Sequence, residues 1–256
     1  MWWLATFTMD ENLSSLITFA LVGLIAQLID GSLGMAYGVS STTFLLSLGI
    51  PPALASASVH TAEVLTTAVS GVSHFRLGNI NASLFRRLVI PGAIGGFLGA
   101  YILTAVPGDT IKPYITLYLL LMGLFIIWKA FQKYNEATRM HKRIVPLALV
   151  GGIFDAIGGG GWGPIVTSTL VASGHSPRYV IGSVNAAEFF VTIVQAATFL
   201  TILGTAHWIA VLGLIIGGVP AAPFAAYLTG RISPRRLMLL VGLLIVTLSI
   251  RNMLVG

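Results

Sequence analysis

Apolar residues along this chain form ten stretches that short polar or glycine-rich interruptions separate. In the first half they cover residues 13–30, 38–49, 52–74, 88–106 and 113–133, and in the second half 144–157, 163–174, 177–203, 208–229 and 234–255. A helix that crosses a bilayer needs roughly 20 apolar residues, and the second stretch of each half has only about a dozen. We expect short broken or re-entrant helices there. The pattern predicts an all-α polytopic membrane protein with eight to ten helices.

The second half of the chain repeats the first with an offset of 125 residues. Between positions 24–69 and their counterparts, 14 of 46 residues are identical without a gap, including Asp30 with Asp155 and Glu63 with Glu188. Two units of about five helical segments each are therefore expected to share one membrane body. A duplicated membrane unit with paired polar interruptions is typical of secondary transporters.

Composition excludes several classes of protein. Of the 256 residues, 56% are hydrophobic and only 9% are charged, so the chain is expected to be solvated by a lipid bilayer. The absence of cysteine excludes disulfides, thiol catalysis and cysteine-ligated metals. The net charge of +6 comes from short loops and indicates membrane orientation rather than nucleic-acid binding. The N-terminus lacks a basic region and a cleavage site, so Leu13–Ile29 is expected to be a retained helix.

Positive charge predicts opposite orientations for the two halves. Basic residues lie between the third and fourth stretches of the first half, at the central connection, and between the fourth and fifth stretches of the second half. Positive loops face the cytoplasm, so this displacement predicts an inverted repeat with both termini on the outer side. We expect a first transmembrane repeat over residues 1–133, a basic cytoplasmic connector over 134–143 and a second repeat over 144–256.

Two glycine-rich breaks are the strongest candidates for a binding site. Each precedes a short helical stretch that contains hydroxyl side chains, and a helix N-terminus offers unpaired N–H groups and a partial positive charge. An anion site is expected where the two breaks meet near the membrane midplane. The alternative is that the glycines only permit close helix packing. The candidate ligands are Gly34, Tyr37, Gly38, Ser41 and Thr42 from the first break, and Gly159, Gly160, Trp162, Gly163, Thr167 and Ser168 from the second.

Four acids lie inside the apolar stretches. An ionised carboxylate at the membrane centre costs at least about 2.5 kcal/mol, so each needs a use or a partner. Glu63 and Glu188 have no Lys or Arg within their own stretches and are predicted to carry coupling protons. Asp30 and Asp155 directly precede the glycine breaks, where a structural cap and a coupling role are both open.

Polar residues at helical spacing surround the two glutamates. In the first half His60, Thr67 and His74 fall on the face of Glu63, and in the second half Asn185, Thr192 and Gln195 fall on the face of Glu188. We expect His60 and Asn185 to add hydrogen bonds to a bound anion, with His60 able to titrate near neutral pH. The sequence has no phosphate loop, metal-ligand spacing or Ser–His–Asp order, so no metal, cofactor or enzymatic activity is expected.

These features resemble the TauE/SafE family of sulfite and organosulfonate exporters. The resemblance rests on the acid followed by a glycine break, on the block Gly49–Asn81 and on its echo Gly174–Gln195, and it extends over nearly the whole chain. The first break, GSLGMAYG, has fewer consecutive glycines than many members. The resemblance implies a multi-pass inner-membrane protein that moves a small sulfur-containing anion such as sulfite, sulfoacetate or a related sulfonate.

The expected function is therefore export of such an anion by alternating access. The membrane potential drives an anion outward by about 2.3 kcal/mol per charge per 100 mV, so export needs no coupling ion. The alternatives are a proton-coupled uptake permease, an anion channel and a membrane-embedded enzyme. The anion, the direction, the coupling ion and the oligomeric state stay open at this point.

Overall fold

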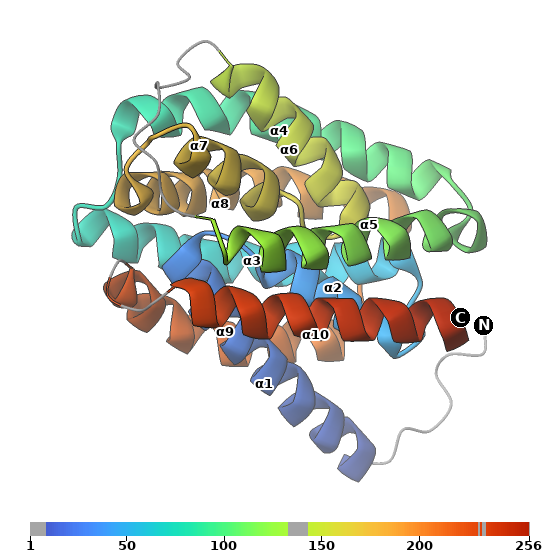
Figure 1. The fold of residues 1–256 in the computed structure, drawn as a ribbon. Coiled ribbons are helices and arrows are strands. Elements are labelled where there is room, and N and C mark those ends of the chain that lie inside the picture. The colour runs from blue at the N-terminus through green and yellow to red at the C-terminus, as the bar shows by residue number, and fades with distance from the viewer. Residues whose placement is uncertain (1–8, 133–142, 230, 232–233, 256) are drawn as a thin grey trace.

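The protein is a bundle of helices (Figure 1). The computed structural model describes residues 9–132, 143–229, 231 and 234–255, and these contain no strand. The first half forms α1 (Met9–Leu33), α2 (Tyr37–Ser47), α3 (Pro52–Arg76), α4 (Ala82–Ala105) and α5 (Gly108–Lys129). The second half forms α6 (Ile144–Gly158), the π-helix η1 (Gly163–Thr167), α7 (Ser168–Ala172), α8 (Pro177–Leu203), α9 (Trp208–Leu228) and α10 (Pro234–Val255). The expected all-α membrane architecture is confirmed.

Five of the described helices are long and apolar enough to cross a membrane. They are Leu13–Leu33 within α1, then α4, α5, α8 and α9. Large apolar side chains such as Leu21, Ile90 and Phe224 are exposed on these helices, as lipid-facing residues should be. The helix α3 is 25 residues long but carries the polar stripe of the first half on its buried side. The protein is thus a multi-pass membrane protein whose polar residues face inward.

The helices α4 and α5 begin five to six residues before the apolar stretches that predict them. The stretch expected from residue 88 starts as α4 at Ala82, because the side chain of Asn81 accepts the N–H groups of Ser83 and Leu84, each at 3.0 Å. The stretch expected from residue 113 starts as α5 at Gly108, because the carbonyl of Pro107 accepts the first amides of the helix. The capping groups thus extend each helix by a polar first turn, which hydropathy alone does not predict.

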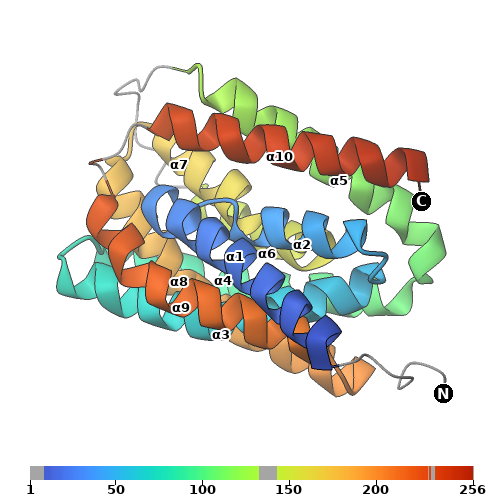
Figure 2. The same cartoon turned by 90° about the horizontal axis from the view of Figure 1, so that it is seen from below.

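The two halves pack through matched pairs of helices. Helix α1 lies along α9, and its repeat counterpart α6 lies along α4 (Figure 2). In the same way α3 packs on α8, and α5 packs on α10. Glycines allow the closest approaches, since a Cβ at Gly217 would overlap the backbone carbonyl of Ala20, and one at Gly152 would overlap that of Gly92. Each half therefore completes its core with helices of the other.

The helices α3 and α8 cross in opposite directions. The hydroxyls of Thr67 and Thr192, equivalent positions of the repeat, lie 3.5 Å apart. On either side of them Ser70 donates to Asn185 at 2.8 Å, and the ring of His60 lies 5.9 Å from that of Phe199. Residue numbers therefore rise in one helix as they fall in the other. Antiparallel equivalent helices are what an inverted repeat requires, although the orientation of each half in the bilayer stays a prediction.

Matched loop contacts repeat the same relationship. The backbone N–H of Asn81, before α4, donates to the hydroxyl of Ser183 in α8, and that of His207, before α9, donates to Ser58 in α3, both at 2.8 Å. The Nδ1 of His207 accepts the N–H of Ala210 at 3.3 Å and so caps α9. Burial lowers the pKa of His207, which favours the neutral ring that this capping contact needs.

Most described basic residues lie at one end of the bundle. This end holds the α3–α4 and α9–α10 connections and the C-terminal end of α5 (Figure 1). Arg178, at the start of α8, donates to the side chain of Asn79 at 2.6 Å and to the carbonyl of Leu77 at 2.9 Å. Arg235, at the start of α10, stacks 4.7 Å from the ring of Phe131. The assignment of this end to the cytoplasm remains the prediction of the positive-inside rule.

Candidate functional site

The two glycine breaks lie against each other at the centre of the bundle. The first separates α1 from α2, and the second separates α6 from η1. Both contain a glycine in the left-handed backbone region at the same repeat position, Gly34 with φ 68° and Gly159 with φ 65°. Other residues rarely adopt this conformation, so glycine is required there to end one helix and redirect the chain.

Contacts between the breaks are reciprocal. The hydroxyl of Thr42 donates to the carbonyl of Gly159 at 2.7 Å, and that of Thr167 lies 3.1 Å from the position a Cβ would take at Gly34. A Cβ at Gly38 would lie 2.6 Å from the Cα of Gly160. Its counterpart Gly163 packs equally tightly on Met35 and on the carbonyl of Gly34. The glycines therefore serve close packing as well as chain reversal, and the breaks are closed on each other in this conformation.

The two breaks differ in detail. In the first, Ala36 has φ 98°, which is strained for a residue with a Cβ. In the second, Gly160 has φ 154°. The second short helix also begins with a π-helical turn, from Gly163 to Thr167, whereas α2 is a regular α-helix of 11 residues. The weaker glycine content of the first break thus corresponds to a different backbone path.

The aspartates before the breaks act as caps to different degrees. The Oδ1 of Asp155 accepts the N–H groups of Gly161 at 2.8 Å and Trp162 at 2.9 Å. Its Oδ2 accepts from the amide of Gln195 at 2.8 Å and lies 3.3 Å from Nε2 of His60. Asp30 instead accepts one long contact, from the N–H of Tyr37 at 3.5 Å. Asp155 therefore binds backbone amides of the second break that we expected to bind an anion.

The glutamates face the same centre. Glu63 is 2% exposed, and its Oε1 lies 3.3 Å from the position of a Cβ at Gly38. Its Oε2 has no hydrogen-bond partner and lies 3.8 Å from Nε2 of His60. Glu188 is 5% exposed and lies within electrostatic range of the other three acids. Among the described residues, His60 is the basic side chain that contacts these acids.

Several buried polar atoms of the short helices that follow the breaks have no partner among the described residues. The hydroxyls of Ser41, Thr167 and Ser168 are at most 1% exposed and make no hydrogen bond. An unsatisfied buried group of this kind costs about 1–3 kcal/mol. Three such hydroxyls, together with Oε2 of Glu63, are available to a ligand that would enter between the breaks.

Gln27 and the role of Gln195 were not predicted from the sequence. Both amide atoms of Gln27 in α1 are buried without a partner, and Oε1 of Gln195 in α8 is likewise unsatisfied. Gln27 lies 3.3 Å from the position of a Cβ at Gly31, beside the first break. The available signal was a lone amide in an otherwise apolar helix, as for Gln27 in the stretch 13–30. Gln195 was recognised as part of the polar stripe, but its bond to Asp155 depends on the tertiary fold.

Three other candidate residues bond to neighbouring helices. The indole of Trp162 donates to the carbonyl of Val184 at 3.3 Å and packs on Gly92, while the hydroxyl of Tyr37 lies 3.5 Å from the carbonyl of Leu214. Asn185 accepts from Ser70 and donates to its own helix at Ile181. These three side chains hold the helices together in this conformation.

His74 shares a face of α3 with Glu63 but bonds to other groups. Its Nε2 is 2.9 Å from the carbonyl of Gly31, while Nδ1 faces the amide of Asn79 at 3.1 Å. Because an amide nitrogen only donates, Nδ1 accepts and Nε2 carries the proton that is donated to Gly31. Asn79 in turn accepts from Arg178. This chain of bonds joins the start of α8 to the first glycine break.

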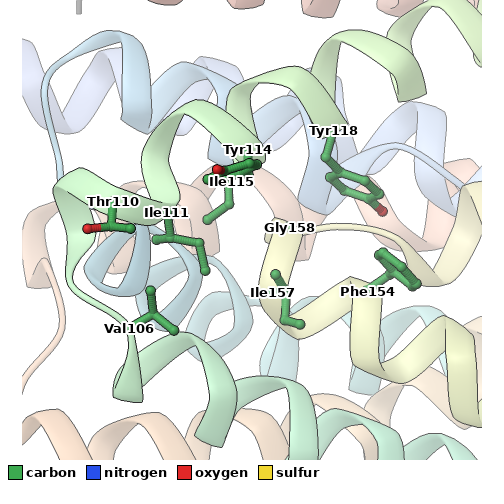
Figure 3. A pocket seen from close by; sticks show the side chains of 9 residues that line it. All are labelled: Val106, Thr110, Ile111, Tyr114, Ile115, Tyr118, Phe154, Ile157 and Gly158. Atoms are coloured by element: carbon green, nitrogen blue, oxygen red, sulfur yellow. The ribbon is translucent and has the colours of Figure 1, made fainter.

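Two cavities open in the bundle, and neither is lined by Ser41, Thr167 or Ser168. One, of about 370 Å³, is lined almost wholly by apolar side chains of α5 and α6, from Thr110 and Tyr114 to Phe154 and Ile157 (Figure 3). Tyr118 separates it from the second break: its ring stacks on Phe154, and its hydroxyl donates to the carbonyl of Gly160 at 3.3 Å. The other, of about 330 Å³, lies at the basic end of the bundle.

Comparison with known proteins identifies the family. The model of the family described as "Sulfite exporter TauE/SafE" matches residues 19–252. The chain belongs to the TauE/SafE family. It is 47% identical over 250 residues to "Probable membrane transporter protein YtnM" of Bacillus subtilis (strain 168), covering 94% of this chain and 83% of that protein. "Probable membrane transporter protein YjnA" of the same organism is 22% identical over 251 residues, covering 92% of this chain and 98% of its own length. No solved structure gives a significant match.

The family sets the class of function. A TauE/SafE membrane transporter of small anions agrees with the inward-facing polar residues of this bundle, and the names of family and relatives indicate transport rather than catalysis. The roles of the individual site residues remain predictions.

The two aspartates provide a test of the site geometry. Asp155→Ala removes the acceptor for two backbone amides and one side-chain amide, whereas Asp30→Ala removes one long contact. We expect the first variant to lose about 2 kcal/mol more stability than the second, because buried donors would be left unpaired. Thermal unfolding of the purified variants in the same detergent measures the difference. Equal losses would contradict the asymmetric capping.

Proposed function

We propose that this protein is a secondary transporter that exports a small sulfur-containing anion, such as sulfite or a small sulfonate, by alternating access. The substrate would bind between the two glycine breaks. The observation that carries the proposal is the closed contact of the breaks, which lead into short helices whose buried hydroxyls, Ser41, Thr167 and Ser168, lack partners among the described residues. Membership of the TauE/SafE family supports the substrate class.

The crossing of the two glycine breaks, once opened, would offer groups that bind an oxyanion. Hydroxyl groups donate to sulfur-bound oxygens, and the N-terminus of the 11-residue helix α2 adds a partial positive charge. At the second break the backbone amides bind Asp155, so the hydroxyls are its free donors. His60 lies between Asp155 and Glu63, and its Nδ1 donates to the carbonyl of Ser56 at 2.7 Å, so its Nε2 would donate to the anion with the ring in its doubly protonated form. Substrate binding would thus replace contacts that the breaks now make with each other.

Four carboxyl groups around this site would repel an anion if all were ionised. Lys and Arg form no ion pair with them among the described residues, so protons are the remaining means of neutralisation. Glu63 has an unpartnered oxygen directly at the first break, and Glu188 approaches from α8. Proton binding at Glu63 and Glu188 would therefore accompany anion binding, and the two would be released together.

Opposed halves supply a route for alternating access. The antiparallel crossing of α3 and α8 allows one half to rock against the other about Thr67 and Thr192. The breaks would then part toward one side of the membrane at a time. Because the site is closed in this conformation, a carrier is favoured over an anion channel, which needs a continuous open path.

A proton-coupled uptake permease is the second candidate. The same carboxyl cluster favours it, because inward movement of an anion runs against the membrane potential and needs a coupled ion. Uptake and export share the site and differ in the direction of the driving gradients.

The unpartnered hydroxyls predict a loss of substrate affinity without a loss of stability. Ser41→Ala and Thr167→Val should each raise the half-saturation concentration for counterflow of labelled sulfite in proteoliposomes about tenfold, the effect of one hydrogen bond of about 1.4 kcal/mol. Thermal unfolding should not shift downward, since neither hydroxyl has a partner in the closed state.

Matched controls lie on the same short helix. Ser40 and Thr43 are equally buried, but their hydroxyls donate to the carbonyls of Ala36 and Val39. Ser40→Ala and Thr43→Val should leave the half-saturation concentration within about twofold of wild type. The site assignment would be wrong if the control and test variants behaved alike. Absence of counterflow in the wild-type protein would reject a carrier for sulfite.

Proton coupling predicts a specific defect in the glutamate variants. Glu63→Gln and Glu188→Gln cannot release a proton, so transport driven by a pH gradient should be abolished while exchange of labelled for unlabelled substrate continues. Asp109→Asn, an exposed acid in the first turn of α5, serves as the control and should respond to the gradient like wild type. Retention of the full gradient response in both glutamine variants would remove the coupling proposal.

A further inference from the structure

The second cavity lies outside the crossing, at the basic end of the bundle. Its volume is about 330 Å³, and it is formed where the first turns of three helices converge, α4, α6 and α8. Its polar lining comes from both halves: Asn81, Ser83, Arg87, His175, Ser176 and Tyr179. No acidic residue lines it within the part of the chain that the structure describes. From this lining we infer that the cavity is a second anion site, one that binds a tetrahedral or pyramidal oxyanion.

The donors in the cavity suit such a ligand. Arg87 supplies a guanidinium with five N–H groups, so it can bind an oxyanion in addition to the other interactions it makes. Ser83, Ser176 and Tyr179 add hydroxyl donors from α4 and from the start of α8. Sulfate, sulfite, sulfonate and phosphate groups share the three or four oxygens that such a set can bind.

The repeat shows that the fold does not require this polar lining. The offset of 125 residues places Ile50 opposite His175, Pro51 opposite Ser176 and Leu54 opposite Tyr179. Helices α4 and α9 start 126 residues apart, which places Ile209 opposite Ser83 and Gly213 opposite Arg87. Of the polar lining residues, Asn81 alone has a polar counterpart, His207. The same backbone arrangement thus has an arginine and hydroxyl side chains at one end only, which assigns the anion site to that end.

Two sources could provide the oxyanion. A free inorganic ion would reach the cavity from the aqueous phase, and a lipid phosphate would reach it from the bilayer surface, where α4 exposes apolar side chains such as Ile90. The site does not depend on the proposed transport route, because none of its lining residues belongs to the crossing.

The test uses neighbouring arginines as a matched pair. Arg87 lines the cavity, whereas Arg86 bonds through Nε to the carbonyl of Ala82 at 3.2 Å and does not line it. The full chain is placed in nanodiscs of phosphatidylcholine, and binding of labelled inorganic phosphate is measured. Retention of phosphatidylglycerol is measured in parallel by native mass spectrometry. Arg87→Gln should weaken one of these interactions at least tenfold, and Arg86→Gln should change neither more than twofold.

The two arms distinguish the sources. Phosphate binding lost in Arg87→Gln identifies a site for free oxyanions, and loss of phosphatidylglycerol identifies a lipid-phosphate site. If Arg87→Gln unfolds at a lower temperature than wild type, Ser176→Ala provides the second variant, with an expected weakening of about threefold. The proposal is overturned if wild type binds neither probe, or if the variants of Arg87 and Ser176 bind both like Arg86→Gln.

A further variant separates this site from the crossing. The double variant Ser41→Ala with Thr167→Val should bind phosphate or phosphatidylglycerol as tightly as wild type, even where its counterflow fails. Loss of binding in that variant would show that the cavity is not a separate site. Normal counterflow affinity in Ser41→Ala and Thr167→Val would reject the crossing as the transport site and leave this inference standing.

Discussion

The antiparallel crossing of α3 and α8 at Thr67 and Thr192 is the constraint on which the rest of the structure depends. Because these are equivalent positions of a repeat, the contact relates the two halves of the chain. It brings the glycine breaks together so tightly that a Cβ at Gly38 would lie 2.6 Å from the Cα of Gly160. The same relationship pairs α1 with α9 and α6 with α4. A core that neither half could complete alone thus becomes one membrane body.

Close packing of the breaks leaves several buried polar groups without hydrogen-bond partners among the described residues. Asp155 is well satisfied by two backbone amides and Gln195, but Glu63 and the hydroxyls of Ser41 and Thr167 are not. Groups of this kind disfavour a permanently closed state, since each unsatisfied one costs about 1–3 kcal/mol. A ligand that enters between the breaks would satisfy them at the expense of the glycine contacts. The proposed cycle of the transporter is an exchange between these two sets of interactions.

Much of the fold could be predicted from the sequence, because lipid imposes a length on apolar helices and a duplication repeats every signal. The repeated pattern of an acid followed by glycines, at Asp30 and Asp155, predicted the positions of both breaks and of the short helices that follow them. The acids of the apolar stretches are buried, as expected. Side-chain direction could not be predicted. The matched aromatic residues Tyr37 and Trp162 were expected among the anion ligands, yet the ring of each packs against a glycine of a neighbouring helix. Nothing local shows that Asp155 accepts two amides while Asp30 accepts one. Such differences arise from the packing of helices that are distant in sequence.

The most direct measurement of the central claim is a disulfide between the equivalent threonines. The chain has no cysteine, so Thr67→Cys with Thr192→Cys introduces the only two thiols. A protease site inserted in residues 133–142 allows the halves to be separated on a denaturing gel. The account predicts that oxidation keeps the halves linked until a reductant is added. Thr61→Cys with Thr192→Cys, displaced about 9 Å along α3, should stay unlinked. Free thiols in the first pair, or equal linkage in both pairs, would contradict the crossing.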